Sequence, residues 1–327
     1  MWANEEVTEL VETLRRHNNR LPEEERLGFY GLDVYSLWES LEAVMNYLRR
    51  EHPDAVEAAL RAYDCFEPYG GSAREYARAT AFVPTSCEEE VVGMLSELVR
   101  GAAEHPEDGS EAHFAAEQNA FVARNAERYY RAMIWGGASS WNVRDRHMIE
   151  TLGRLLDYHG PDAKAIVWEH NTHVGDARYT DMAENGLVNV GQLTRERWGE
   201  GGVTIVGCGS HRGSVIAAAE WGAPMERMPV PPAREGSWEA VLHRAVGEDR
   251  LLVFSGPEED ELLRERNHRA IGVVYHPGSE RYGNYVPTVL PRRYDAFLYL
   301  DETRALRPLH PPWSGEPEEP ETFPSGE

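Results

Sequence analysis

The chain opens with a hydrophobic pattern typical of an amphipathic helix. Apolar residues recur at helical spacing at Val7, Leu10, Val11 and Leu14. Helical patterns return over most of residues 37–160. The clearest segments there lie at about 52–63, 87–103, 111–134 and 142–159. Because this stretch is too long for one crossover helix, we expect a large helical insertion packed on a sheet.

Short apolar runs bounded by polar residues predict the strands. They lie at about 26–33, 164–169, 203–209, 251–255, 270–275 and 296–300. Two of these runs are continuously apolar, which is typical of strands buried on both faces. Helical segments lie between several of the runs. We therefore predict an α/β fold whose sheet is mostly parallel, with helices on both faces.

These patterns divide the chain into four regions. Residues 1–36 begin the α/β core, 37–162 form the helical insertion and 163–306 complete the core. Residues 307–327 are rich in Pro, Glu, Ser and Gly, and we expect this tail to be disordered because it offers little apolar surface to bury.

Charge and cysteine content narrow the class of protein. The 327 residues include 56 acidic and 33 basic side chains, and the net charge of -23 argues against nucleic acid or an anionic membrane as partner. No apolar stretch approaches the length of a membrane span, and we expect no signal peptide. Cys65, Cys87 and Cys208 are widely spaced. We therefore expect a cytoplasmic protein with reduced cysteines and no disulfide.

The strongest candidate chemistry follows the predicted strand at 164–169. Residues 168–176, which we call the histidine segment, place His170 and His173 just past an apolar run. Open α/β sheets bind their ligands at that edge, and histidine transfers protons near neutral pH. A lone histidine at a strand end is more often a hydrogen-bonded structural residue. Two histidines with Asn171 between them indicate an active site.

Three further residues are candidates for the same edge. Asp33 ends the strand predicted at 26–33, where it either forms a turn or orients a histidine or a substrate hydroxyl. Arg144 and Asp145 open a predicted helix, where they either form its first turn or reach a substrate oxygen. We predict that Asp33, Arg144 and Asp145 share one cleft with His170 and His173, because the ends of parallel strands share an edge.

A metal site is the main chemical alternative. His170, His173 and Asp176 could supply nitrogen and oxygen ligands to one cation. Residues 171–172 do not favour the helix that would place both imidazoles on one face. The sequence also lacks a phosphate-binding loop and a Gly-x-Ser-x-Gly serine. We expect no cofactor and no metal, and we keep the metal-dependent hydrolase as an alternative.

Several segments, taken in order, resemble the erythromycin esterase family of hydrolytic enzymes. They are residues 29–36, 117–130, 140–148, 167–176, 189–193, 270–275 and 294–297. The resemblance implies metal-independent hydrolysis of a macrolide lactone or another small ester by a water that histidine activates. The family's motif histidines fall on His170 and His173. One would polarise the substrate and the other would share its proton network, and Asp33, Arg144, Asp145 and Asn171 would bind substrate.

The sequence also departs from the family pattern. The family's proposed base is a histidine in a Gly-His motif on an N-terminal strand, and this chain begins downstream of that region. Glu169 replaces a residue that is usually small, and residues 284–285 are Asn-Tyr where His-Tyr is common. We therefore expect a truncated member that hydrolyses esters poorly and self-associates through an uncovered sheet edge. A catalytically inactive binding protein of the same fold is a further alternative. Where the ester is a macrolide lactone, the resemblance implies antibiotic resistance.

Overall fold

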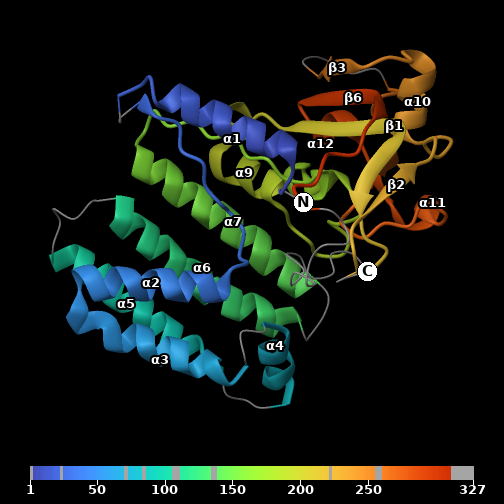
Figure 1. Ribbon diagram of the computed structural model, residues 1–327. Coiled ribbons are helices and arrows are strands. Elements are labelled where there is room, and N and C mark those ends of the chain that lie inside the picture. Colours follow the sequence, from blue (N-terminus) through green and yellow to red (C-terminus); the bar gives the residue numbers. More distant parts are fainter. Residues whose placement is uncertain are drawn as a thin grey trace. The chain divides into compact units, whose positions relative to one another are not determined.

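The computed structural model describes residues 3–22, 25–69, 73–82, 86–104, 111–133, 138–220, 223–254 and 260–310. The chain divides into two compact units, which we treat separately (Figure 1). Leu32–Ala165 form the helical unit, and Met1–Gly31 with Ile166–Glu327 form the mixed unit. Of the tail predicted to be disordered, residues 311–327 lie outside the described residues.

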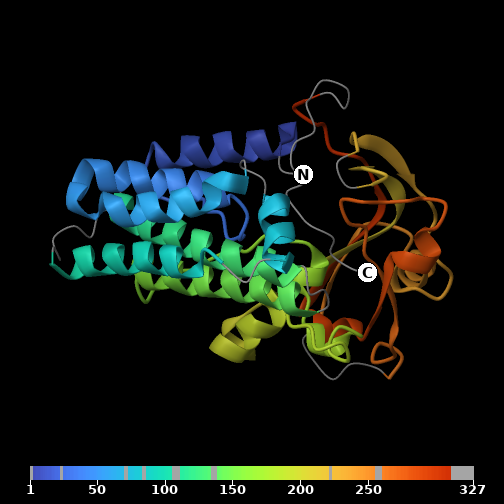
Figure 2. The ribbon, with the colours of Figure 1, turned by 90° about the horizontal axis from the view of Figure 1, so that it is seen from below.

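The helical unit contains the helices that the hydrophobic pattern predicts and one further helix, α4, that it did not single out. They are α2 (Leu37–Glu51), α3 (Val56–Phe66), α4 (Ala73–Phe82), α5 (Glu88–Glu104), α6 (Glu111–Met133) and α7 (Ala138–His159), with short 3-10 turns at Pro53–Ala55 and Glu67–Tyr69. Helix α6 is central, because it packs against α2, α4, α5 and α7. Both views show α6 and α7 side by side (Figure 1, Figure 2). The helical predictions for this part of the chain are confirmed.

The core of the helical unit is apolar and follows helical spacing. Helix α2 buries Leu37, Leu41, Val44 and Leu48, which lie on one face of the helix. Phe66 is fully buried, with its ring edge-on to the rings of Trp38 and Tyr76 at centroid distances of 5.7 and 4.9 Å. Each large apolar side chain buried in this way contributes about 1.5–3 kcal/mol to folding.

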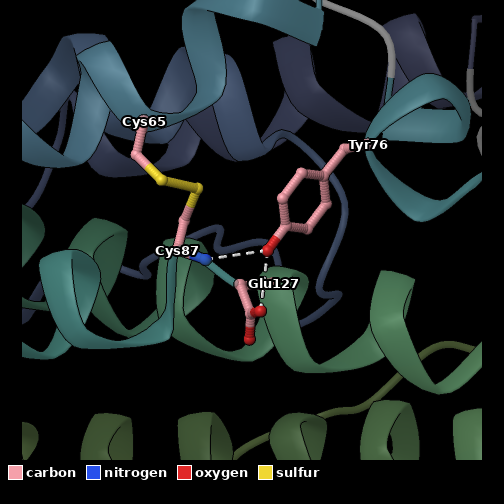
Figure 3. The surroundings of a disulfide bond; sticks show 4 residues. All are labelled: Cys65, Tyr76, Cys87 and Glu127. Atoms are coloured by element: carbon pink, nitrogen blue, oxygen red, sulfur yellow. Dashed lines mark hydrogen bonds between the residues drawn. A yellow bond between two sulfur atoms is a disulfide. The ribbon is translucent and has the colours of Figure 1, made fainter. Parts of the chain in front are cut away.

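A disulfide joins Cys65, on α3, to Cys87, just before α5 (Figure 3). The prediction of reduced cysteines without a disulfide is therefore wrong. The two residues are 22 positions apart and have no recognisable spacing, so only the packing of α3 on α5 brings their Cα atoms to 5.9 Å. Cys208 is a free cysteine.

A buried hydrogen-bond network adjoins the disulfide. The Tyr76 hydroxyl donates to Oε1 of Glu127 at 2.8 Å and accepts from the backbone N–H of Cys87 at 3.0 Å (Figure 3). Burial raises the pKa of Glu127, although the hydrogen bond from Tyr76 and the nearby Arg131 oppose the shift. The network thus ties the start of α5 to α4 and α6.

The mixed unit contains a four-stranded sheet in the order β2-β1-β6-β3. Its strands are β1 (Val206–Ala217), β2 (Glu226–Val230), β3 (Arg250–Val253) and β6 (Ala296–Thr303). Strands β1 and β6 are parallel, whereas β2 and β3 pair antiparallel with their neighbours. A separate antiparallel pair joins β4 (Arg266–Arg269) to β5 (Tyr285–Thr288). The fold is thus mixed α/β with a small, mostly antiparallel sheet, and the prediction of a mostly parallel sheet is wrong.

Connection length explains the antiparallel pairing of β1 with β2. Only residues 218–225 separate β1 from β2, which is too short for the dozen or more residues of a parallel crossover. The runs at 203–209, 251–255 and 296–300 do become β1, β3 and β6. The segments at 26–33 and 164–169 are irregular, and 270–275 contributes a single bridge, between Val274 and Ala218. Those three strand predictions are wrong because an apolar run alone does not supply a pairing partner.

The remaining elements of the mixed unit are mostly short. They are α1 (Glu5–Asn18), α8 (Asn171–Val174), α9 (Val190–Trp198), α10 (Trp238–Ala245), α11 (Glu280–Gly283) and α12 (Leu290–Arg293), with 3-10 turns at Ala177–Tyr179 and Glu200–Gly202. Helix α1 confirms the helix predicted at the start of the chain. Among the described residues, no helix combines the length and apolar character of a membrane span.

Large apolar side chains remain exposed in the two irregular segments at 26–33 and 164–169. Ile166 is 98% exposed, Trp168 67% and Phe29 66%. By contrast, Trp238, Tyr294 and Phe297 are at most 1% exposed in the core between α10, α12 and the sheet.

Candidate functional site

The histidine segment contacts β1 through the side chain of Asn171 rather than through strand pairing. Helix α8 begins directly after His170, which serves as its N-cap. The side-chain amide of Asn171 then pairs with the backbone of Cys208 on β1. Its Nδ2 donates to the Cys208 carbonyl at 2.5 Å, and its Oδ1 accepts from the Cys208 N–H at 3.0 Å. Asn171 therefore takes the place of a neighbouring strand at this position.

Both ring nitrogens of His170 are engaged. Its Nδ1 accepts from the backbone N–H of Thr172 at 3.3 Å and lies 2.9 Å from the Thr172 hydroxyl. Its Nε2 lies 3.0 Å from the carbonyl oxygen of Ile271, so Nε2 carries the hydrogen and donates it. Burial, and then the neighbouring His173, lower the pKa of His170 to about 4. His170 is therefore a neutral hydrogen-bond donor near pH 7.

Beside Asn171 lies a buried pair that the sequence did not reveal. Nδ1 of His268, on β4, is 2.5 Å from Oε1 of Glu239, on α10. The same oxygen accepts from the backbone N–H of Arg269 at 2.9 Å. Nε2 of His268 lies 3.3 Å from Nδ2 of Asn171. Burial raises the pKa of Glu239, but His268 and the hydrogen bonds outweigh it, so this pKa lies below its ordinary value.

Arg293 and Tyr294, at the end of α12, complete the surroundings of Asn171. Arg293 donates to the Asn171 carbonyl at 3.0 Å, and the Tyr294 ring is edge-on to His268 with centroids 5.8 Å apart. Burial raises the pKa of Tyr294 to about 12, so its hydroxyl stays protonated. Gly175 and Gly207 let the ring approach, because a Cβ on either residue would meet it at 2.7 Å.

Asp176 is committed to arginines rather than to the histidines. Its carboxylate accepts from Nη2 of Arg178 at 2.6 Å and from Nη1 of Arg195 at 3.0 Å. Within the described residues, no three His, Cys, Asp or Glu side chains are grouped so that they could hold a metal ion. The arrangement therefore does not support His170, His173 and Asp176 as one ligand set.

In the helical unit, the structure brings Asp33 and Arg144 together. Arg144 donates from Nε and Nη2 to the two carboxylate oxygens of Asp33, at 2.9 and 2.6 Å. Burial lowers the pKa of Arg144, but the bonds to Asp33 outweigh this and hold it above its ordinary value. The guanidinium also lies 4.9 Å from the centroid of the Tyr35 ring. Asp145 is fully buried on α7.

The predicted site residues thus fall into two groups. Asp33, Arg144 and Asp145 belong to the helical unit, whereas His170, Asn171 and His173 belong to the mixed unit. Their common cleft stays a prediction. Glu239 and His268 were missed because they are far apart in the sequence and neither carries a local motif. The one available signal was a charged residue between the apolar Trp238 and Ala240 of a short helix.

A family model for erythromycin esterase matches residues 1–303. The chain belongs to the erythromycin esterase family. Among curated proteins it is similar to the putative hydrolase YbfO of Bacillus subtilis (strain 168), with 28% identity over 167 residues. That alignment covers 50% of this chain and 35% of the relative, so the match spans about a third of the relative's length.

Two solved structures share the fold. One is a succinoglycan biosynthesis protein, with a TM-score of 0.72 and 18% identity over 94% of this chain and 72% of that chain. The other is a protein from Bacillus cereus, with a TM-score of 0.70 and 15% identity over 94% of this chain and 74% of that chain. At these identities the likeness concerns the fold alone.

Proposed function

We propose that this member of the erythromycin esterase family hydrolyses a small ester or lactone, with His170 and His173 in its active site. Membership of a family of hydrolases supports the reaction class. The main observation that supports this location of the active site is the position of the histidine segment. The side chain of Asn171 hydrogen-bonds this segment to β1, beside the buried pair of Glu239 and His268.

The hydrogen bonds of His170 favour a particular role in this reaction. Water attack on an ester needs a proton acceptor for the water and donors for the oxyanion that forms. Because His170 has a pKa of about 4 and carries its hydrogen on Nε2, it suits the donor role. In the proposal, the substrate oxygen replaces the Ile271 carbonyl as acceptor. His173, buried on α8, shares the proton network and receives the proton of the attacking water, and Asn171 holds the histidine segment in place through its bonds to Cys208.

The test is hydrolysis by the full chain of p-nitrophenyl acetate, and of erythromycin followed as addition of water in its mass spectrum. We expect low turnover, and the informative quantity is its ratio between variants. His170→Ala should lower kcat/KM by about a hundredfold, the lower end of the usual contribution of acid–base groups. His243→Ala is the control, because this imidazole pairs instead with Asp301 at 2.6 Å. Equal rates in His170→Ala and the unsubstituted protein would refute the proposal.

A binding protein of the same fold is the second candidate. The occupied nitrogens of His170 and the burial of His268 favour it, since neither imidazole presents a free nitrogen to solvent. Calorimetry with erythromycin separates the two: heat of binding without any change in ligand mass would support the binding protein.

A further inference from the structure

Glu239 and His268 form a hydrogen-bonded carboxylate–imidazole pair with no access to solvent. Their side chains are 0% and 1% exposed, and the rings of Tyr294 and Phe297 pack edge-on against the imidazole. A substrate therefore cannot reach either residue in this arrangement. The outward contact of the pair is Asn171, whose amide meets Nε2 of His268. Asn171 is therefore the hydrogen-bonded link between the pair and the histidine segment.

The tautomer of His268 is coupled to the orientation of that amide. An ionised Glu239 accepts a hydrogen from Nδ1, which leaves Nε2 of a neutral imidazole as an acceptor. This acceptor matches the Nδ2 donor of Asn171 in the orientation that pairs with both backbone groups of Cys208. A hydrogen on Nε2 would face the Asn171 donor, and flipping the amide would break both bonds to Cys208. The buried carboxylate thus favours one tautomer of His268 and one orientation of Asn171.

The pair and its neighbours include buried polar atoms without a hydrogen-bond partner among the described residues, which argues against a purely stabilising role. Oε2 of Glu239, Nε of Arg293 and the hydroxyl of Tyr294 are buried without a hydrogen-bond partner among the described residues. An unpaired buried polar group costs about 1–3 kcal/mol. Apolar side chains of similar volume are often as stable as a buried ion pair. The geometry that the pair imposes on Asn171 is a reason to retain it.

We propose that Glu239 and His268 are positioning residues that fix the amide of Asn171 and thereby hold His170 with its Nε2 hydrogen directed away from α8. The inference deepens the proposed function and rests on it. Asn171 follows His170 directly and accepts from Arg293 at its carbonyl, so its position sets where α8 begins. The charged or titratable groups that act on His170 are His173, Arg293 and His268.

The experiment records ¹⁵N spectra of the histidine rings in the full chain near pH 7. We expect His268 as the Nδ1–H tautomer and His170 as the Nε2–H tautomer. His268→Phe, which keeps a ring between Tyr294 and Phe297, should convert His170 to a mixture of tautomers. It should also lower kcat by up to about a hundredfold with little change in KM, because a small misplacement of a reacting group has effects of that size. His243→Phe is the matched control, since it removes the imidazole of another carboxylate pair in the same unit.

The mechanism is tested by combining variants. If the pair acts through Asn171, His268→Phe has no further effect on the His170 signals in an Asn171→Ala background. Full additivity, or an unchanged His170 tautomer in His268→Phe, would overturn the inference. Glu239→Gln, which keeps the volume and removes the charge, answers the same question if His268→Phe does not fold. Absence of turnover in the unsubstituted protein would refute the proposed function, and the spectra would still decide the positioning role.

Discussion

The two units of the chain are stabilised in different ways. The core of the helical unit is built from apolar side chains at helical spacing, with Phe66 among aromatic rings at its centre. The helical unit also buries Glu127, Arg144 and Asp145. The mixed unit has smaller apolar clusters and buries more charged groups, including Asp176, Glu239, Arg269 and Arg293. The first kind of core depends on volume, and the second depends on each charge keeping its partner.

This difference predicts where single substitutions are most damaging. A buried ion pair adds little net stability over apolar residues, but removal of one partner leaves an uncompensated charge. In the mixed unit, substitutions should be most damaging at Asp176 and Arg269. Asp176 accepts hydrogen bonds from two arginines, and Arg269 donates to Glu280 at 2.6 Å.

The largest expected effect is that of Asp176→Ala. It removes a fully buried carboxylate that pairs with both Arg178 and Arg195, and it leaves the 5% exposed side chain of Arg195 with Asp295 as its remaining carboxylate partner. Breaking this buried network should lower the free energy of unfolding by about 3–5 kcal/mol. Urea denaturation of the full chain measures the change. Glu302→Ala is the control, because its pair with Arg212 is 60% and 53% exposed, and such pairs contribute about 0–1 kcal/mol. Similar losses in both variants would contradict the assignment of stability to buried charge pairs.

The disulfide should give the next largest effect, confined to the helical unit. Cys65 and Cys87 close a loop of 22 residues, and a closure of this length stabilises a protein by about 3 kcal/mol in the chain-entropy description. The double variant Cys65→Ser, Cys87→Ser should lose about this much and gain hydrogen exchange in α3 and α5. Cys208→Ser should change neither the free energy of unfolding nor the hydrogen exchange of α3 and α5. A disulfide-free protein with unchanged exchange would show that packing alone holds these helices together.

How far the sequence predicts the fold also differs between the units. In the helical unit, a long periodic segment such as 111–134 contains many apolar positions that each indicate a helix. The predicted limits of this segment therefore lie close to those of α6. In the mixed unit, runs of four to eight apolar residues predict an extended segment but not its partner. Residues 164–169 have such a run but do not join a sheet. By contrast, β2 and β5 form from segments without a clear apolar pattern.

The site shows the same limit. The histidine segment is recognisable because its residues are consecutive. The contact of Asp33 with Arg144 joins residues 111 positions apart, and their role in binding substrate stays a prediction. Glu239 and His268 are separated by 29 positions, and their contact exists only because α10 packs against β4. A sequence motif records neighbours along the chain, whereas a buried pair of this kind depends on tertiary packing.

A pH-dependent prediction compares one histidine from each unit. Burial lowers the pKa of His147, which accepts from Asn125 at 2.8 Å, to about 4, as it does for His170. Unfolding returns each imidazole to its ordinary value near 6.5, so the unfolded chain binds more protons between these values. The contribution of each neutral, buried histidine to the free energy of unfolding is therefore fully present above pH 6.5. It decreases as the pH falls towards 4, with a loss of about 2 kcal/mol per histidine at pH 5.

The substitutions His147→Gln and His170→Gln should each flatten that pH dependence. Urea midpoints at about pH 7 and pH 5 measure it, and the change in slope across this window is the relevant quantity. His17→Gln, on the exposed face of α1, is the control. A pH dependence that survives in both buried variants would assign it to other groups.

The smallest expected effect on stability concerns the exposed apolar residues of the mixed unit. Ile166 is 98% exposed, so Ile166→Lys removes almost no folded contact and should change the free energy of unfolding by less than about 0.5 kcal/mol.

Exposed apolar patches nevertheless favour association, so we propose that this residue and Trp168 contribute to self-association of the chain. Ile166→Lys should shift sedimentation towards the monomer. Val92→Lys, at a position that is 41% exposed on α5, adds the same charge to the helical unit and should leave association unchanged. If both variants dissociate the protein equally, net charge rather than this apolar surface governs association. If Ile166→Lys unfolds it, Ile166 is buried in solution and the segment at 164–169 is paired after all.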